Sequence, residues 1–238
     1  PHIMIQNKKD PQIENYGDII EKLKGIEGVK AVIPQIDTQA IVKFNDFAKG
    51  VLAQGMDSEN VKNDINLKII SGNNNIDELN SILIGDAFSK EMVLNVGDEI
   101  SLVSAENKEL KLIVRGIFKT GFLQYDSNLI IIPLTTMQIL SERGEVVTEI
   151  GIKTEQPQKV EGVLSKVREM VAPYEFFAVS WKQTNQTLLN AVRFEKVVLL
   201  AILSLLLIIA CFAVSVILNM IVREKIKDIG ILKSVGYT

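Results

Sequence analysis

Few residues in this sequence have the types and spacing of a catalytic or ligand-binding site. The chain contains one histidine, His2, and one cysteine, Cys211, so neither a histidine-paired metal site nor an internal disulfide can form. The sequence has no nucleophile-elbow motif, no paired-histidine motif and no calcium-binding loop. We therefore expect no catalytic site and no bound cofactor or metal ion in this chain.

The segment 116–121 (GIFKTG) has the two-glycine spacing of a phosphate-binding loop. The residues that follow it are Phe122 and Leu123, where such a loop has lysine and then serine or threonine. Without that lysine, no side chain is placed to bind the phosphates. We interpret the segment as a bend between strands that ends one strand without starting a helix.

Composition narrows the classes of partner and divides the chain into two regions. The 238 residues include 26 Lys and Arg against 29 Asp and Glu, a net charge of −3, which gives no electrostatic footprint for nucleic acid. Residues 197–222 contain no Asp, Glu, Lys, Arg or His. Because about 20 apolar residues suffice to cross the hydrocarbon core of a bilayer, we predict a transmembrane helix joined to a water-soluble region.

The predicted span continues as helix on both sides. No proline follows Gln183, and the late glycines are Gly230 and Gly236 alone. We therefore expect one unbroken helix made of a stalk (182–196), the span (197–222) and a flank (223–238). A continuous helix resists bending, so it can carry a displacement across the membrane. The way the chain begins and stops also suggests a part of a longer membrane protein.

Small or polar residues recur along one face of the predicted span. Their spacings of seven, four and four residues bring them close together on a helix, where small side chains let another helix approach and polar ones can hydrogen-bond to it. We interpret them as a seam against a second membrane helix. The alternative is a chance distribution, with the last residue lying near the headgroups. The residues are Ser204, Cys211, Ser215 and Asn219.

Charge at the two ends of the span favours a cytoplasmic C-terminus. Arg223, Lys225, Lys227 and Lys233 follow the span, against three basic residues in segment 182–196, and the side richer in Lys and Arg faces the cytoplasm. The flank is also amphipathic, with its isoleucines and leucine mostly on one side. It could dock a partner or lie along the headgroups, and the alternative is a solvated stop-transfer flank.

The water-soluble region reads as an α+β domain assembled from both ends. Residues 1–35 predict strand, helix and strand, with Asp18 as a possible N-cap and Pro34 ending the second strand. Residues 147–181 repeat that pattern, with a helix opening at Pro157. We expect the two units to share one helix-covered sheet. Residues 36–146 predict an inserted β-rich module.

Two features of this region carry further expectations. The polar turn at 104–109 (SAENKE) is short, so its flanking strands should form a hairpin. Trp181 stands where the last strand gives way to helix. We interpret it as a core or hinge-packing residue, with an anchor at the membrane surface as the alternative.

Three stretches together resemble the lipoprotein-releasing ABC transporter permease family (LolC/LolE type), within the MacB/FtsX-like permease group. The first, 190–236, is similar to that family's second span, with its entry at Arg193, Glu195 and Lys196 and its exit EKIKDIGILKSVG. The second is GIFKTGFLQYDSNLIIIPL, which contains the Tyr-Asp-Ser element. The third is ILIGDAFSKEMVLNVGDEISLVS.

The resemblance implies an extracytoplasmic MacB-like periplasmic core domain, with a split βαβ "porter" layer (1–35 and 147–181) and an inserted β-rich "sabre" subdomain (36–146), followed by one long transmembrane helix. It implies a bacterial cytoplasmic (inner) membrane protein with residues 1 to about 196 outside. ATP hydrolysis would occur in a separate ABC ATPase subunit, with a second permease subunit as partner. The ATPase-coupling segment would comprise Glu224, Lys225, Asp228, Ile229, Gly230, Ile231, Leu232 and Gly236.

The resemblance also leaves the cargo open. In some Lol-type subunits the hairpin corresponding to 104–109 is extended into a hook that captures a periplasmic lipoprotein carrier. Here that turn is short, so docking of a carrier on this chain is not expected even where a lipoprotein is the cargo. A MacB/FtsX-like mechanotransmission permease with other cargo is one alternative. A single-span sensor or receptor is another.

Overall fold

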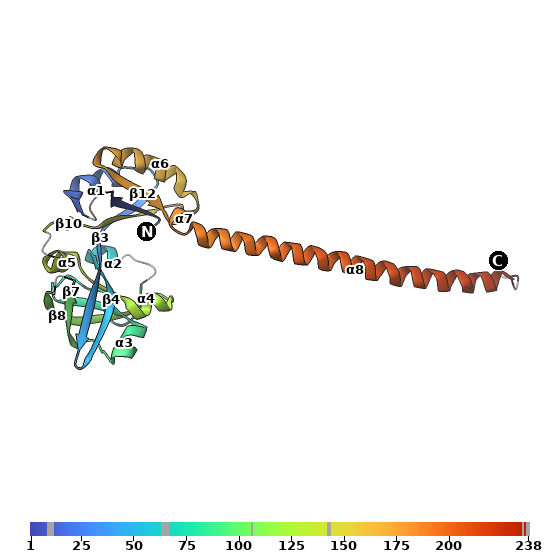
Figure 1. Ribbon diagram of the computed structural model, residues 1–238, viewed down its shortest axis with the longest axis horizontal. Helices are drawn as coiled ribbons and strands as arrows, with labels where there is room; N and C mark the ends of the chain where they lie inside the picture. The colour runs from blue at the N-terminus through green and yellow to red at the C-terminus, as the bar shows by residue number, and fades with distance from the viewer. Residues whose placement is uncertain (9–11, 63–66, 106, 142–143, 235, 237–238) are drawn as a thin grey trace. The chain divides into compact units, whose positions relative to one another are not determined.

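The computed structural model describes residues 1–8, 12–62, 67–105, 107–141, 144–234 and 236. The chain divides into two compact units, residues 1–184 (unit 1) and 185–238 (unit 2) (Figure 1). Unit 1 holds a sheet in the order β12-β1-β11-β3-β4-β9-β6-β8-β5, and β7 also pairs with β3 and β8. A smaller two-stranded sheet pairs β10 with β2.

Unit 1 is built of strands, often two in succession, separated by short helices. The strands are β1 (Ile3–Asn7), β2 (Ile13–Glu14), β3 (Val29–Phe44), β4 (Phe47–Met56), β5 (Lys68–Gly72), β6 (Ser81–Gly85), β7 (Glu99–Ser104), β8 (Glu109–Lys119), β9 (Leu129–Pro133), β10 (Val146–Val147), β11 (Glu149–Thr154) and β12 (Phe176–Ser180). The helices are α1 (Tyr16–Lys24), α2 (Ser58–Lys62), α3 (Asp86–Met92), α4 (Leu123–Asn128), α5 (Leu134–Ser141), α6 (Val160–Val171) and α7 (Trp181–Thr184), with 3₁₀ turns η1 (Pro157–Lys159) and η2 (Ala172–Tyr174).

The two ends of unit 1 interleave in one sheet. Strand β1 lies between β11 and β12 and is antiparallel to both, while β11 lies between β1 and β3. Each strand–helix–strand unit is therefore split by a strand of the other, which is the split βαβ arrangement. Helices α1 and α6 bury apolar side chains against this layer and lie together on one side of it (Figure 1). The predicted α+β fold with a shared, helix-covered sheet is confirmed.

The prediction that Pro34 ends a strand is wrong. Strand β3 runs from Val29 to Phe44 without interruption, pairing with β11 up to Gln35 and with β4 from Gln35 onward. Because Gln35 accepts a hydrogen bond from Thr148 on the β11 side, the backbone of Pro34 faces the other side. Pairing with β4 has not begun there, so no ladder bond requires the missing N–H of Pro34.

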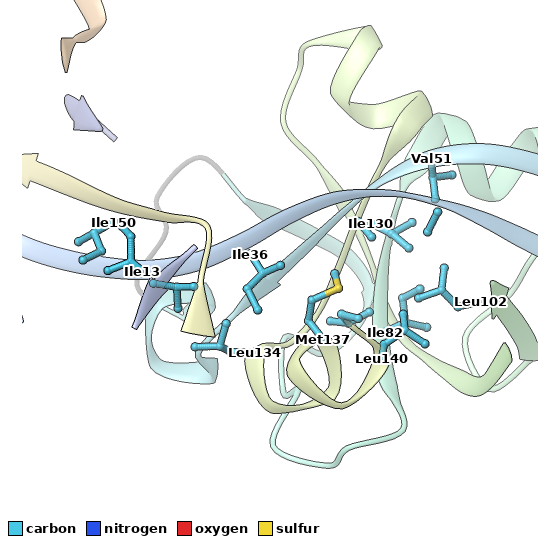
Figure 2. Packing of buried hydrophobic residues seen from close by; sticks show 14 of the residues in the cluster. Ile13, Ile36, Val51, Ile82, Leu102, Ile130, Leu134, Met137, Leu140 and Ile150 are labelled. Atoms are coloured by element: carbon cyan, nitrogen blue, oxygen red, sulfur yellow. The ribbon is translucent and has the colours of Figure 1, made fainter. Parts of the chain in front are cut away.

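The continuity of β3 joins the two predicted subdomains. One buried hydrophobic cluster includes Ile150 from the predicted porter-like subdomain. It also includes Ile36 on β3, and Ile82 and Ile130 from the predicted sabre-like subdomain (Figure 2). Figure 2 shows Met137 of α5 within this cluster. A Cβ on Gly55 would lie 2.7 Å from the Cβ of Met137, so the glycine allows the helix to pack closely on β4. The division at residues 35/36 and 146/147 remains a proposal.

Two further local predictions need correction. The N-cap of α1 is Asn15, with a left-handed φ of 49°, while Asp18 lies in the first turn of the helix. The segment 116–121 does lead into a helix, the six-residue α4. Asp126 of that helix accepts hydrogen bonds from the backbone at Thr120 and Gly121, which folds the chain back too tightly for a simple bend.

The predicted hairpin at 104–109 is confirmed for the residues that the structure describes. Strands β7 and β8 pair antiparallel from Glu99 opposite Ile113 to Val103 opposite Glu109. The Ser104 amide donates to the Lys108 carbonyl at 2.8 Å, and the Asn107 amide donates to Ser104 at 3.0 Å. The connection is therefore a short turn, although Glu106 lies outside the described residues.

We expect Gly85→Ala to destabilise unit 1 by about 1–3 kcal/mol, because a Cβ there would overlap the backbone of Asp126. The matched control is Gly162→Ala in α6, whose Cβ would meet nothing within 4 Å. That change should stabilise the helix by roughly 0.5–1 kcal/mol. Urea unfolding followed by the fluorescence of the single tryptophan measures both. Equal effects of the two substitutions would contradict the close approach of α3 and α4.

Candidate functional site

Most residues predicted to act in this chain lie on one helix. Helix α8 spans Gln186–Ser234, 49 residues, and none of them is buried. At 1.5 Å per residue it is about 74 Å long, more than twice the roughly 30 Å of a bilayer's hydrocarbon core. Within the described residues it is the one helix long and apolar enough to cross a membrane. The structure thus joins stalk entry, seam and coupling segment through an unbroken backbone.

The prediction of unbroken helix from the stalk through the flank holds from Gln186 to Ser234 and is wrong at Asn185, where the chain turns between two helices. Helix α7 ends at Thr184, whose hydroxyl donates to the Ser180 carbonyl at 3.3 Å. The Asn185 carbonyl accepts the first bond of α8, from Leu189 at 2.9 Å. Asparagine favours such an N-cap position because its short side chain competes with helical bonding. The break at Asn185 contains neither proline nor glycine, so the sequence gives little indication of it.

The polar residues of the predicted seam are satisfied within α8. The Ser204 hydroxyl donates to the Ala201 carbonyl at 2.8 Å, and the Asn219 amide donates to the Ser215 carbonyl at 3.0 Å. In hydrocarbon these bonds remove the cost of an unpaired polar group. The Cys211 thiol is exposed on the same face. The seam therefore needs no partner to be tolerated in lipid, and its contact with another helix stays a prediction.

The predicted coupling residues up to Leu232 lie on the exposed last turns of α8, and Gly236 follows the helix. Lys225 lies 3.9 Å from the carboxylate of Asp228 one turn later. Gly230 is inside the helix with open space around its Cβ position. Gly236 has a φ of 87° and donates to the Lys233 carbonyl at 3.1 Å, a conformation in which glycine is favoured after a helix end. The stalk-entry residues Arg193, Glu195 and Lys196 are likewise exposed on α8. These side chains are thus free to meet a partner.

A carboxylate pair that sequence reasoning missed lies where β3 passes between its two sets of neighbours. The Gln35 side chain donates to Asp37 at 3.1 Å and to Glu149 at 3.2 Å, so one amide bridges both acids. Gln6 donates to the second oxygen of Glu149 at 2.9 Å, and Gln54 donates to the second oxygen of Asp37 at 2.9 Å. The five residues come from four strands, β1, β3, β4 and β11, so local pattern could not bring them together.

Both acids of this pair bind protons more readily than ordinary carboxyls. Burial raises the pKa of Asp37, and the hydrogen bonds from Gln54 and Gln35 offset part of that rise. Burial also raises the pKa of Glu149, and the neighbouring charge of Asp37 adds to it. Asp37 on β3 and Glu149 on β11 are both bonded to side-chain amides, and no nucleophile faces them among the contacts above. We interpret it as a structural junction.

His2 and Trp181 both have structural partners. The Nδ1 atom of His2 accepts from the Thr154 amide at 2.9 Å and lies 3.0 Å from that residue's hydroxyl. Burial lowers the pKa of His2 and so favours its neutral form. Trp181 packs against the core and its indole N–H donates to the Pro157 carbonyl at 3.2 Å, as expected for a core-packing residue.

Comparison with known proteins identifies related chains. The family described as "MacB-like periplasmic core domain" matches residues 2–170. The chain is 24% identical over 251 residues to the lipoprotein-releasing system transmembrane protein LolC of Buchnera aphidicola subsp. Schizaphis graminum, covering 99% of this chain and 60% of that protein. It is 23% identical to LolC of Neisseria meningitidis serogroup B, covering 93% and 57%. The chain thus spans about three fifths of these relatives.

Solved structures show the same fold. The extracellular domain of the noncanonic ABC-type transporter YknZ from Gram-positive bacteria aligns with a TM-score of 0.57 at 12% identity, over 76% of this chain and 100% of that one. The periplasmic region of MacB from Actinobacillus actinomycetemcomitans aligns with a TM-score of 0.54 at 14% identity, over 79% and 92%. Relatives and structures together confirm the resemblance to LolC/LolE-type and MacB-like permeases.

We expect the stability of unit 1 to fall from acid toward neutral pH, and Asp37→Asn to reduce that fall. The raised pKa values mean that the folded state holds its protons more tightly than the unfolded state. The stability gained from this tighter proton binding is fully present below the pKa range of ordinary carboxyls. It is lost as the pH rises through the raised pKa values of Asp37 and Glu149. Urea unfolding from about pH 4.5 to about pH 7.5 measures it.

The control for this experiment is Asp46→Asn in the exposed turn between β3 and β4. Its pH profile should run parallel to that of the native chain. A native profile that Asp37→Asn leaves unchanged would contradict the proposed pair.

Proposed function

We propose that this chain, which belongs to the family of MacB-like periplasmic core domains, is the extracytoplasmic domain and second span of an ABC transporter permease subunit. The observation that carries the proposal is the unbroken helix α8, which runs from unit 1's side of the membrane through the uncharged segment 197–222 to the charged flank. With Lys and Arg enriched after the span, residues 1 to about 196 lie outside a bacterial inner membrane.

The chain works by passing on motion. ATP is hydrolysed in a separate ABC ATPase subunit. Closure of the ATPase moves the end of α8, and the rigid helix carries that displacement to unit 1. The coupling residues on α8, which lie between Glu224 and Leu232, are the contact, since they are exposed on the last turns of the helix.

A second permease subunit completes the assembly in the membrane. The seam of Ser204, Cys211, Ser215 and Asn219 supplies a face of small and polar side chains, which lets two helix backbones approach closely. The partner helix exchanges the internal bonds of Ser204 and Asn219 for bonds across the interface, at little net cost in hydrogen bonding. Either a copy of this chain or a related subunit meets that requirement.

The cargo we propose is a lipoprotein released from the outer face of the membrane. The relatives LolC of Buchnera and of Neisseria are named for a lipoprotein-releasing system. The short connection between β7 and β8 argues that a soluble carrier does not dock on that hairpin. A carrier, where one acts, meets the partner subunit instead.

We expect Val192→Pro to uncouple cargo release from ATP hydrolysis in the full-length transporter. A proline inside a helix costs about 3 kcal/mol and kinks it, so displacement at the inner end no longer reaches unit 1. Val192 lies in α8 before the span and is half exposed, and Val192→Ala is the matched control that keeps the helix. Lipoprotein release per ATP hydrolysed, in reconstituted vesicles, is the measurement. Equal lipoprotein release by the two variants would show that α8 does not transmit the displacement.

We also expect Asp228→Asn and Gly230→Leu to weaken transport-coupled ATPase stimulation by about tenfold each. The first removes the charge that faces Lys225, and the second fills the open space at Gly230 through which the ATPase approaches. Thr187→Ala, near the outer end of α8, is the control and should leave stimulation unchanged. If Asp228→Asn and Gly230→Leu leave ATPase stimulation as unchanged as the control does, the assigned coupling segment is refuted.

A further inference from the structure

An apolar tip on unit 1 has no role in the proposed transmission of motion. Phe122, Leu123 and Tyr125 form the start of α4 and its cap, with 56%, 73% and 51% of their surfaces exposed. The rings of Phe122 and Tyr125 meet edge to face, with centroids 5.2 Å apart. These three side chains, the α4 tip, therefore present one cluster to the surroundings.

The α4 tip is held outward by a buried carboxylate. Asp126 is 4% exposed and accepts from the Thr120 amide at 2.7 Å, the Thr120 hydroxyl at 2.8 Å and the Gly121 amide at 3.2 Å. Gly121 takes a left-handed φ of 84°, and the missing Cβ of Gly85 lets the helix approach β6. The apolar side chains are thus fixed in an exposed position by a network within the fold.

Two lysines stand at the base of the tip. Lys68 on the edge strand β5 pairs directly opposite Lys119 at the end of β8, three residues before Phe122. Both side chains are exposed, and neither makes a hydrogen bond or an ion pair with the part of the chain that the structure describes. Like charges directly opposite on neighbouring strands destabilise a sheet. An anionic surface against this face would remove that cost.

The α4 tip and its two neighbouring lysines have the composition of a membrane-binding surface. Apolar and aromatic side chains beside basic ones are the composition that inserts at a membrane surface, with rings at headgroup level and lysines on anionic lipid phosphates.

We propose that the α4 tip docks unit 1 on an anionic lipid bilayer, with Leu123 and the two rings among the headgroups and Lys68 and Lys119 on lipid phosphates. The proposal rests on α8 being a membrane span, and on neither the cargo nor the ATPase. It assigns unit 1 a second membrane contact, made and broken while α8 stays inserted. With α8 inserted and the α4 tip able to bind or release lipid, unit 1 can rest on the membrane surface in one state and stand away from it in the other.

The test places an environment-sensitive nitrobenzoxadiazole label on Leu123→Cys in the Cys211→Ala background of the whole chain. The chain is reconstituted through α8 into vesicles of neutral phosphatidylcholine, or of phosphatidylcholine mixed with phosphatidylglycerol. We expect a blue-shifted emission, quenched by spin-labelled lipid, in the anionic vesicles. The same label on Ile139→Cys, an α5 side chain 58% exposed, should show no such change.

The lysines are tested with a matched pair of double variants. K68Q/K119Q should lower the docked-to-undocked ratio roughly 30-fold, since a lysine near an anionic membrane is worth about a factor of five. K24Q/K166Q removes the same charge from two lysines already paired with Glu21 and Glu27, and should leave the ratio unchanged. High salt should act as K68Q/K119Q does.

Three results would overturn the proposal. The first is a label at Leu123 that responds to no vesicle, and the second is an equal response at Ile139. The third is a response in neutral vesicles that grows with protein density, which would assign the tip to a second copy of the chain. Flotation of the chain with vesicles reports insertion of α8 separately. A silent label on floated vesicles therefore rejects the docking and leaves the proposed function standing.

Discussion

The fold of unit 1 depends on the pairing of one long strand. Strand β3 pairs with β11 over its first half and with β4 and β7 over its second, so the strands of both halves are placed relative to it. Its residues Val32, Ile36 and Val42 belong to one continuous hydrophobic cluster. A strand shared in this way transmits a tilt of one half to the other, because sliding one past the other would break ladder bonds and core packing together.

Polar groups are placed at two sites where apolar packing alone would be cheaper. Half-buried Asp37 and buried Glu149 both bond to Gln35, and Asp126 of α4 is buried. Burying a carboxylate is costly unless its oxygens are hydrogen-bonded, and here amides from several strands or a turn satisfy them. The first site fixes the register between β3 and β11, and the second fixes the direction of an exposed apolar cluster. Both sites therefore serve mainly to fix one local arrangement, and they add less to the free energy of folding.

Helix α8 is suited to hydrocarbon, whereas unit 1 is suited to water. In hydrocarbon each backbone polar group must be bonded within the segment, so a single helix satisfies the requirement without any partner. Its serine and asparagine side chains bond to their own turns for the same reason. Stiffness follows from that bonding, and the absence of proline preserves it. The same backbone arrangement therefore suits helix α8 both to hydrocarbon and to the transmission of motion proposed above.

The sequence alone determined the features that local pattern encodes. The uncharged run 197–222, the helical periodicity of α1 and α6, and the missing lysine after Gly121 follow from residue type and spacing along the chain. Those patterns sufficed for the α+β class, the membrane helix and the family resemblance. They did not show that β3 passes through Pro34 or that a helix begins at Leu123, because both depend on which neighbour pairs with a given backbone group.

Tertiary structure alone decided the contacts between distant residues. Gln35 and Glu149 are brought within hydrogen-bond distance by strand pairing, and Lys68 is set opposite Lys119 by a register that no local pattern contains. The physical reason is that periodicity reports which face of an element is buried, whereas pairing reports what that face meets. The junction of carboxylates and the lysine-flanked tip belong to the second kind of information.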